Sequence, residues 1–389
     1  MEYAEVCEWF ASQEQKTLYG GLERVARGCA YFNNVEASLR CVHVAGTNGK
    51  GSTCVKIARV LQNAGYTVGL YTSPHISSMR ERIQINGVLI PEQDLARLVS
   101  SIIKMDTTLS AFEVMTLAAF LWYREKKVDI AVLEVGMGGK LDATNVCHPD
   151  ISIITSISFD HTQYLGNTLS SIAENKAGII KRGTPVVIGP RVPYEVIEPR
   201  AKELNAPLYR VEGGFWDYDE ENSAIARRAL ELLQKDWKGL EIDTVSQYRP
   251  PCRFEDVPQD RLRGAPRIIL DVAHNPDGID KLLCKLGKGK AIFLCSISQD
   301  KDIPTMLASL LHDAAGLICT QALSKRAIKS ERLGKIALDL KPSCPVRIEA
   351  QVDRAVALGI DMALEKSVPL VITGTFYLMD QVKRILWSR

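Results

Sequence analysis

A glycine-rich run with one lysine and two hydroxyl side chains, Val44 to Thr53, carries the clearest chemical signal in the sequence. It follows a short apolar stretch and opens a helical pattern, the context in which phosphate-binding loops occur. Glycines let consecutive backbone N–H groups converge on phosphate oxygens, the helix N-terminus adds partial positive charge, and Lys50 neutralises terminal phosphates. The spelling is irregular, because Gly51 separates Lys50 from the hydroxyl residues. A glycine-rich turn without a ligand is the plainer alternative, and we predict a nucleotide-phosphate site.

Three further side chains stand where apolar runs end. Glu134 closes the run Ile130 to Glu134, which puts a hard oxygen ligand suited to Mg²⁺ at the sheet edge where α/β proteins bind ligands. The alternative is a strand-capping carboxylate paired with an arginine. Ser73 lies in a Thr-Ser-Pro-His sequence that a turn alone would explain. His161 follows another apolar run, where a hydrogen-bonded structural histidine is the commoner explanation.

Alternating strand-like and helical patterns must position these residues. Such alternation indicates βαβ units and a mostly parallel sheet. The pattern restarts after the paired prolines Pro250 and Pro251, which disfavour both helix and central strand. We therefore predict an α/β protein with an N-terminal, mostly parallel sheet domain containing the phosphate loop over residues 1–249, and a smaller Rossmann-like α/β domain over residues 250–389. The strands are expected at residues 41–45, 68–71, 130–134, 151–154 and 185–188, then at 267–271, 290–294, 316–319 and 369–372.

Composition excludes several other classes of protein. The chain has 389 residues, 46% hydrophobic and 24% charged, which is typical of a globular protein with two domains. Its net charge of +2 argues against a broad nucleic-acid surface. The ten cysteines form no C-x-x-C pair, and no run approaches the roughly 18 apolar residues of a membrane span. We expect a cytoplasmic protein with reduced thiols and with neither nucleic acid nor membrane as a partner.

Beyond the loop, the sequence resembles the folylpolyglutamate synthase and dihydrofolate synthase family, a branch of the Mur-type ligases. The matching blocks follow the family's order over nearly the whole chain. They are Gly21-Leu22-Glu23-Arg24-Val25, Thr72-Ser73-Pro74-His75 with Glu81-Arg82-Ile83, the run from Glu134 to Asn145, Asp160-His161-Thr162, Leu165-Gly166, the run from Lys176 to Lys181, Asp271-Val272-Ala273-His274-Asn275-Pro276, and Gly374-Thr375-Phe376-Tyr377.

The resemblance implies an ATP-dependent ligase that joins an amino acid to a carboxylate through an acyl-phosphate. Amide formation at neutral pH needs an activated leaving group, and the site must screen the negative charge of the phosphates. The residues implied to bind nucleotide are Thr47, Asn48, Gly49, Lys50, Gly51, Ser52, Asn222 near the adenine, Arg253 reaching ATP from the second domain, and Asp271. The residues implied to take part in catalysis are Lys50, Lys176 and His274, the last near the transferred phosphoryl group and the incoming glutamate.

Two magnesium ions are implied as well. Ser73 and Glu134 match the ligands of the first, whereas His161 and a carbamylated Lys176 match those of the second. An ammonium cannot bind a cation, but addition of CO₂ to the neutral amine gives an anionic oxygen ligand, which requires burial or nearby charge to depress the lysine pKa. From sequence alone a solvated helical lysine is the commoner situation.

On the acceptor side, Phe112 and Ala143 match positions that line a pterin pocket, and Thr375 stands where a serine is commoner and retains the hydroxyl. A phenylalanine offers a stacking face, although at a helix start it is usually part of the core. Bifunctional members tend to carry aspartate shortly before the Gly-Leu-Glu-Arg motif, whereas this chain has Tyr19. The resemblance therefore favours folate over dihydropteroate as the acceptor.

The expected reaction adds L-glutamate to a folate, with dihydropteroate as a second acceptor to test, ATP as co-substrate, and a monomer as the working unit. Closure of two domains is expected during turnover because both supply reacting groups. Two alternatives stay open. One is a Mur-type amide ligase with a different carboxylate acceptor, since the loop and metal ligands serve the activation step alone. The other is an ATP-binding protein that has lost the chemistry.

Overall fold

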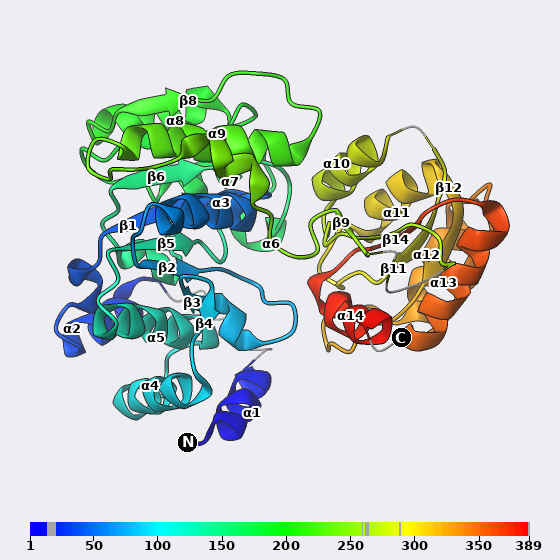
Figure 1. Cartoon of the computed structure of the whole chain (residues 1–389), viewed down its shortest axis with the longest axis horizontal. Coiled ribbons are helices and arrows are strands. Elements are labelled where there is room, and N and C mark those ends of the chain that lie inside the picture. Colours follow the sequence, from blue (N-terminus) through cyan, green and yellow to red (C-terminus); the bar gives the residue numbers. More distant parts are fainter. Residues whose placement is uncertain (14–20, 259, 261–263, 288, 388–389) are drawn as a thin grey trace. The chain divides into compact units, whose positions relative to one another are not determined.

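The computed structural model describes the chain except for residues 14–20, 259, 261–263, 288 and 388–389, so Tyr19 lies outside the described residues. The chain divides into two compact units. The first comprises Met1–Ser158 and Thr162–Arg249, and the second comprises Phe159–His161 and Pro250–Arg389. Figure 1 colours both along the sequence. Within the described residues, no helix is long and apolar enough to cross a membrane.

The first unit is built on a mixed sheet whose strand order is β4-β3-β2-β5-β1-β6-β7-β8. The strands from β2 to β8 in this order run parallel, whereas β3 pairs antiparallel with β2 and β4 antiparallel with β3. The strands are β1 (Cys41–Ala45), β2 (Val68–Tyr71), β3 (Ile83–Ile85), β4 (Val88–Leu89), β5 (Ile130–Glu134), β6 (Ile151–Ile154), β7 (Val186–Ile188) and β8 (Leu208–Arg210).

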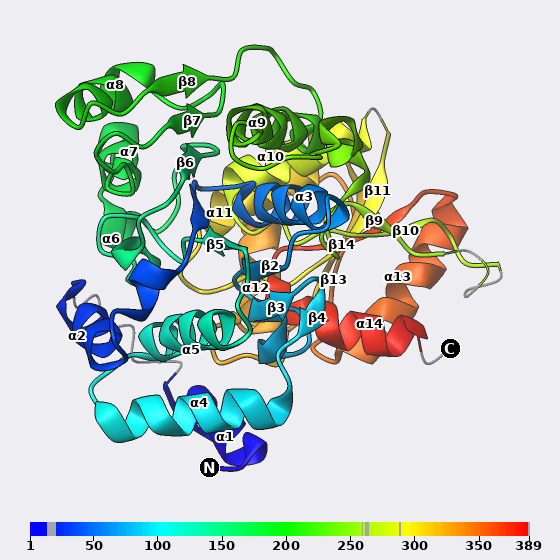
Figure 2. The same ribbon diagram turned by 60° about the vertical axis from the view of Figure 1, so that its left-hand side comes forward.

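Helices cover both faces of this sheet. Alternate residues of β5 enter opposite cores, with Val132 packed among residues of α3 and α9 and Leu133 among those of α4 and α5. Burial on both faces is why the parallel strands are continuously apolar. The pair α3 and α9 lies apart from the pair α4 and α5 in both views (Figures 1 and 2). The helices are α1 (Tyr3–Gln13), α2 (Glu23–Tyr31), α3 (Lys50–Asn63), α4 (Glu92–Met105), α5 (Ala111–Glu125), α6 (Thr162–Leu165), α7 (Leu169–Ala177), α8 (Tyr194–Glu203) and α9 (Tyr218–Leu233), with the 3₁₀ turns η1 (Val35–Ser38), η2 (Met79–Arg82), η3 (Ala143–Val146) and η4 (Ile242–Gln247).

The second unit has a smaller sheet of order β13-β12-β11-β14-β10-β9, parallel except for β9. Its strands are β9 (Glu255–Asp256), β10 (Ile268–Leu270), β11 (Ala291–Cys295), β12 (Ala314–Cys319), β13 (Val346–Ile348) and β14 (Leu370–Thr373). Its helices are α10 (Pro276–Leu286), α11 (Ile303–His312), α12 (Ser330–Asp339), α13 (Val352–Lys366) and α14 (Met379–Trp387), with the 3₁₀ turn η5 (Phe376–Leu378). The predicted α/β class, with a large and a smaller mostly parallel sheet, is confirmed.

Strand register brings the candidate residues of the first unit to one edge. Val44 of β1 pairs with Glu134 of β5, and Tyr71 of β2 pairs with Leu133. The segments that follow β1, β2 and β5 therefore leave the sheet side by side. The carboxyl edge of a parallel sheet is where α/β proteins bind ligands.

Candidate active site

The phosphate loop is held in place by the segment that follows β6. Thr47 N donates to the Ser156 carbonyl at 2.8 Å, and Asn48 N donates to Ser156 Oγ at 3.0 Å. Thr155 Oγ1 donates to the Asn48 carbonyl at 2.6 Å. A Cβ on Gly46 would lie 1.9 Å from Thr155 Oγ1, so only glycine permits this close approach.

Lys50 begins α3, and its amine folds back over the loop. Its Nζ donates to the Thr47 carbonyl at 3.1 Å. The first N–H groups of α3 have no carbonyl partner within the helix, and the helix dipole places partial positive charge at this end. The predicted nucleotide-binding residues Thr47 to Ser52 therefore lie together, with the Lys50 amine and the N-terminus of α3 among them.

Asn222 of α9 lies directly on this loop. A Cβ on Gly49 would lie 2.1 Å from Asn222 Oδ1, and Gly49 has φ +86°. Asn222 is buried, and no sequence motif links it to Gly49. The structure thus brings Asn222 to the residues predicted to hold the phosphates.

Replacing Gly49 by alanine is expected to weaken nucleotide binding by at least about tenfold, because the added Cβ displaces Asn222 from the phosphate loop. Binding of a fluorescent ADP analogue measures the effect. Gly183→Ala is the matched control, since Gly183 has φ +72° with nothing within 4 Å of its added Cβ. Equal losses in both variants would show that strain, and not the contact with Asn222, is responsible.

Glu134 and Ser73 meet at the carboxyl edge of the sheet. Ser73 N donates to Glu134 Oε2 at 2.9 Å, and a Cβ on Gly51 would lie 3.3 Å from the same oxygen. Glu134 as a whole is only 4% exposed, so its side chain lies against the phosphate loop and not in solvent. Glu134, Ser73 and the start of α3 are therefore neighbours.

This pair fits a magnesium ion in the presence of nucleotide. Within the described residues, no group of three or more His, Cys, Asp and Glu side chains could hold a metal by itself. Mg²⁺ is usually held by one or two carboxylates together with waters and substrate phosphates. A buried carboxylate and a hydroxyl beside a phosphate loop match that requirement, so the cation and the nucleotide would bind together.

The loop that carries Ser73 is organised by Glu81. The Glu81 carboxylate accepts hydrogen bonds from the backbone N–H groups of Ile76, Ser77 and Ser78, each at 2.8 Å. Arg82 Nε donates to His75 Nδ1 at 3.0 Å. Glu81 and Arg82, downstream of the Thr-Ser-Pro-His turn, therefore fix the conformation of that turn.

Lys176, in the last turn of α7, is buried and not solvated. It is 4% exposed, and its Nζ donates to the Gly46 carbonyl at 2.9 Å. The commoner situation expected from the sequence, a lysine in solvent, is therefore wrong because α7 packs its last turn under the phosphate loop. His161 belongs to the other unit. A second cation bound by both residues stays a prediction.

Phe112 and Ala143 lie beside the same sheet edge. The Phe112 ring packs on Gly136, whose added Cβ would lie 2.4 Å from Phe112 Cζ, and its centroid is 5.9 Å from that of Tyr71. Ala143 is buried in η3. Ser110 and Glu113 form a capping box that fixes the start of α5, and Arg24 pairs with Glu113 at 3.1 Å. Phe112 is thus a fixed ring close to the segment that follows Glu134.

In the second unit, Asp271 ties two backbone segments together. Its Oδ1 accepts from Ala273 N and its Oδ2 from Phe254 N, both at 2.8 Å. The latter contact fixes the backbone next to Arg253. Thr375 caps η5, since its Oγ1 accepts from Tyr377 N at 3.4 Å.

Phe376 gathers two of the predicted residues of this unit. The Arg253 guanidinium lies 4.8 Å from the centre of the Phe376 ring, and the His274 ring centroid lies 5.3 Å from it. The structure therefore brings Arg253, His274 and Asp271 into one neighbourhood of the second unit. Phe376 was in a matching block of the sequence, but its role in holding them was not predicted.

Asp160 is a buried carboxylate to which several donors converge. Lys301 Nζ lies 2.6 Å from Oδ1, Asn275 Nδ2 donates to Oδ2 at 3.0 Å, and His274 Nε2 lies 3.7 Å from Oδ2. Burial opposes ionisation of Asp160, but the positive charge of Lys301 outweighs it and holds the pKa of this carboxyl well below the usual range. Burial, followed by the charge of Lys301, lowers the pKa of His274 to about 3, so the imidazole is neutral at pH 7.

Replacing Lys301 by methionine is expected to lower the free energy of unfolding by about 3–5 kcal/mol at pH 7, because it leaves the buried Asp160 carboxylate without its nearest cation. Urea unfolding of the second unit measures the change. Arg384→Met, which removes an exposed ion pair with Asp380, is the control and is expected to change stability by less than about 1 kcal/mol. A Lys301 variant as stable as this control would contradict the assigned importance of the buried pair.

Comparison with known proteins shows the family of this chain. Residues 44–189 match the Mur ligase middle domain, and residues 252–376 match the Mur ligase glutamate ligase domain. The folylpolyglutamate synthase of Lacticaseibacillus casei is 30% identical over 99% of both chains, and the Escherichia coli dihydrofolate synthase/folylpolyglutamate synthase is 32% identical over 82% of this chain and 81% of its own. The chain belongs to the folylpolyglutamate synthase family.

Solved structures of the folylpolyglutamate synthase family have the same fold over the full chain. Escherichia coli FolC in complex with DHPP and ADP matches with a TM-score of 0.88 at 28% identity, covering 100% of this chain and 98% of that one. Mycobacterium tuberculosis folylpolyglutamate synthase complexed with ADP and AMPPCP matches with a TM-score of 0.87 at 26% identity, covering 99% and 98%. This chain therefore has the Mur-type ligase fold.

Within this folylpolyglutamate synthase fold, several residues that shape the site were missed from the sequence. Thr155 and Ser156 hold the phosphate loop, and Asp160 and Lys301 organise the neighbourhood of His274. Asp160 stood in a matching block beside His161 and could have been found there. Lys301 carries no motif signal of its own, because its partner is 141 residues away in sequence.

Proposed function

We propose that this chain is an ATP-dependent ligase that joins L-glutamate to the carboxylate of a folate through an acyl-phosphate. One observation carries the proposal most directly: a phosphate loop with Lys50 lies beside the buried Glu134 and Ser73 at one sheet edge. Family relatives named for this activity support it, as does a related bifunctional enzyme structure with Mn, AMPPNP and L-glutamate bound.

In the first chemical step, a carboxylate oxygen of the folate attacks the γ-phosphorus of ATP. The bond from that phosphorus to the β,γ-bridging oxygen breaks, ADP leaves with the electron pair, and an acyl-phosphate forms. Negative charge concentrates on the phosphoryl oxygens in this step, so cations and oriented N–H groups accelerate it. Lys50 and the N-terminus of α3 supply both in this chain.

In the second step, the neutral amine of L-glutamate attacks the acyl carbon. The C–N bond forms and the C–O bond to phosphate breaks, so inorganic phosphate leaves with that electron pair and takes up the proton that the attacking nitrogen loses. His274 is proposed to act near the transferred phosphoryl group and the incoming amine, Asp271 and Arg253 to contact the nucleotide, and Thr375 to contact substrate. The neutral state of the His274 imidazole suits a hydrogen-bonding group near the attacking amine.

Magnesium bound by Ser73 and Glu134, with a second ion at His161 and a carbamylated Lys176, would supply charge neutralisation on the phosphates. The burial of Lys176 supports carbamylation, because desolvation disfavours the ammonium and CO₂ adds to the neutral amine. A carbamate keeps one N–H, so the hydrogen bond to the Gly46 carbonyl can persist. Mass spectrometry under native conditions is expected to show one added CO₂ that is absent from Lys176→Ala.

The acceptor is tested by following ADP release from purified protein with L-glutamate and either tetrahydrofolate or dihydropteroate. We expect turnover with tetrahydrofolate that requires glutamate. Turnover with dihydropteroate would show that the pocket containing Phe112 and Ala143 also accepts this second substrate. ATP binding without turnover on either acceptor would refute the folate assignment. It would also favour a Mur-type ligase that uses another carboxylate.

We also propose that the protein acts as a monomer in the cytoplasm with small molecules as its only substrates. The cysteines of the described residues are free, and most are buried, which is consistent with a reducing compartment. Size-exclusion chromatography with light scattering tests the monomer, and a mass of about twice that of the chain would contradict it.

A further inference from the structure

Lys56 is a fully buried lysine of the first unit that none of the proposed chemical steps uses. It lies on α3, seven residues after Gly49. Its Nζ lies 3.1 Å from Asp219 Oδ1 and donates to the carbonyl oxygens of Tyr248 at 2.8 Å and Val245 at 3.4 Å. An ammonium without solvent needs such partners, because an unpaired buried charge is strongly destabilising.

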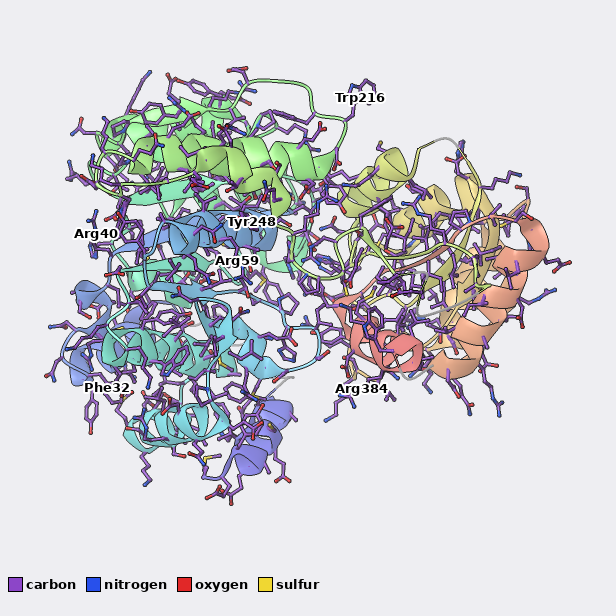
Figure 3. All side chains as sticks on the ribbon, viewed as in Figure 1. Phe32, Arg40, Arg59, Trp216, Tyr248 and Arg384 are labelled. Carbon is purple, nitrogen blue, oxygen red and sulfur yellow. The ribbon has the colours of Figure 1, made fainter. Side chains whose placement is uncertain are left out.

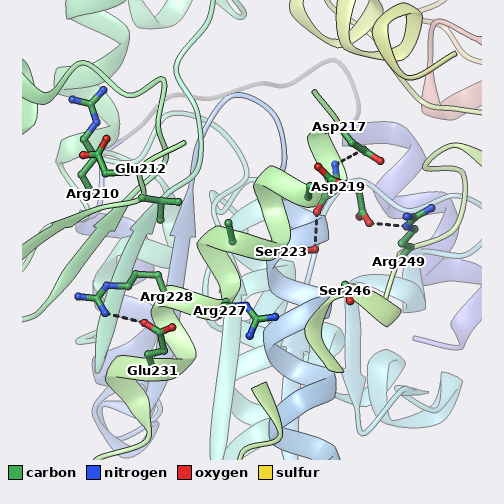
Figure 4. Close-up of a pocket in the computed structure, with 13 residues that line it drawn as sticks. Arg210, Glu212, Asp217, Asp219, Ser223, Arg227, Arg228, Glu231, Ser246 and Arg249 are labelled. Carbon is green, nitrogen blue, oxygen red and sulfur yellow. Dashed lines mark hydrogen bonds and ion pairs between the residues drawn. The ribbon is translucent and has the colours of Figure 1, made fainter. Parts of the chain in front are cut away.

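Asp219 is shared between two cations. Its Oδ2 accepts from Arg249 Nε at 2.7 Å, a contact drawn as a dashed line in Figure 4. Both residues line an open pocket of about 690 Å³. The carboxylate is 7% exposed, whereas the Arg249 side chain is 45% exposed. The three side chains form a row of alternating charge, Lys56, Asp219 and Arg249, that runs from the interior to the surface.

This row joins three segments around the phosphate loop. Lys56 belongs to the helix that begins with the loop, Asp219 lies in the first turn of α9, and Tyr248 and Arg249 end the first unit. Figure 3 shows Tyr248 beside α3, and Asn63 Nδ2 donates to its hydroxyl at 2.5 Å. The ion pair therefore fixes the first turn of α9 against α3.

The same first turn of α9 leads directly to Asn222. Asp219 and Asn222 are three residues apart, so they lie on one face of the helix. Lys56 lies about two turns from Gly49 along α3, and these two residues meet Asp219 and Asn222 respectively. Two contacts thus hold α3 and α9 together: the ion pair between Lys56 and Asp219, and the packing of Asn222 on Gly49.

We propose that Lys56 is a positioning residue for the nucleotide, acting through Asp219 to hold Asn222 against the phosphate loop. This inference rests on the proposed function, since it assumes that the loop binds ATP. The ion pair with Asp219 favours one axial register of α9 on α3, while the carbonyl oxygens of Val245 and Tyr248 hold the Lys56 amine in place. Apolar packing alone would allow neighbouring registers, in which Asn222 no longer meets Gly49.

The test measures the Kd of a fluorescent ADP analogue and the KM values of ATP, L-glutamate and tetrahydrofolate in Lys56→Met. We expect the Kd and the KM of ATP to rise at least about tenfold, with kcat and the other two KM values changed by less than about threefold. The double variant Lys56→Met/Asp219→Asn is expected to bind more tightly than Lys56→Met alone, because it removes the negative charge of the buried Asp219 side chain, whose Oδ1 has lost its Lys56 partner in the single variant. A purely structural role would not produce this selectivity for ATP.

Arg227→Met is the matched control. Arg227 also joins α9 to η4, through Asp243, but that pair is exposed and the variant is expected to bind the analogue normally. If Lys56→Met does not fold, Arg249→Met perturbs the same row from its exposed end and is expected to raise the Kd about threefold. Unchanged binding in folded variants, or equal changes in all three KM values, would overturn the inference. Failure of the wild-type protein to bind the analogue would overturn the proposed function as well.

Discussion

Lys50→Ala is expected to abolish measurable ligation, lowering kcat/KM for ATP by about 1000-fold, which corresponds to about 4 kcal/mol of transition-state stabilisation. The Lys50 amine folds over the loop onto the Thr47 carbonyl, the position from which it reaches the terminal phosphates. A phosphoryl transfer site depends on such a cation because charge builds on the equatorial oxygens as the bond to ADP breaks.

Steady-state ADP release measures this effect, with binding of the ADP analogue as a second reading. The diphosphate lacks the terminal phosphate, so its binding is expected to fall much less than turnover. Lys104→Ala is the control, because Lys104 is an exposed lysine of α4 and its loss leaves the net charge equal to that of the test variant. Near-normal turnover in Lys50→Ala would refute the role assigned to the loop.

Glu134→Gln is expected to reduce kcat by about 100-fold and to raise the magnesium concentration needed for half-maximal rate. The substitution keeps the shape of the side chain and an acceptor for Ser73 N, but it removes the negative charge that suits a cation. Since the carboxylate is buried beside the start of α3, its neutralisation is not expected to lower stability.

Magnesium titration of the initial rate separates this explanation from a folding defect. Thermal unfolding of Glu134→Gln is expected to match that of the wild-type protein. Glu125→Gln, at the exposed end of α5, serves as the control and is expected to leave the magnesium requirement unchanged. A Glu134→Gln enzyme with normal rate and magnesium dependence would show that this carboxylate is structural.

The sequence predicted the sheet positions well because parallel strands buried on both faces are short, continuous apolar runs. The runs at residues 41–45, 68–71, 130–134 and 151–154 are β1, β2, β5 and β6 with the same ends. The helix that follows the phosphate loop begins at Lys50, and its start was not predicted because its first turn forms from polar loop residues that hide the helical period.

Contacts between distant segments could not be predicted in the same way. Lys176 lies in an ordinary helical pattern. Its buried amine donates a hydrogen bond to the carbonyl of Gly46, which is 130 residues away in sequence. Asn222 and Gly49 likewise meet only after α3 and α9 have packed. The resemblance to the family pointed to these residues, whereas the packing of the helices in the folded chain explains the positions of their side chains.

The acyl-phosphate is the central claim, and isotope transfer tests it most directly. Tetrahydrofolate labelled with oxygen-18 in its side-chain carboxyl group is incubated with the enzyme, ATP, magnesium and L-glutamate, and the released phosphate is analysed by mass spectrometry. Because the attacking carboxylate oxygen leaves with the phosphoryl group, one labelled oxygen is expected in each inorganic phosphate formed. Turnover that releases unlabelled phosphate would contradict the mechanism, since ATP hydrolysis would then proceed without activation of the carboxylate.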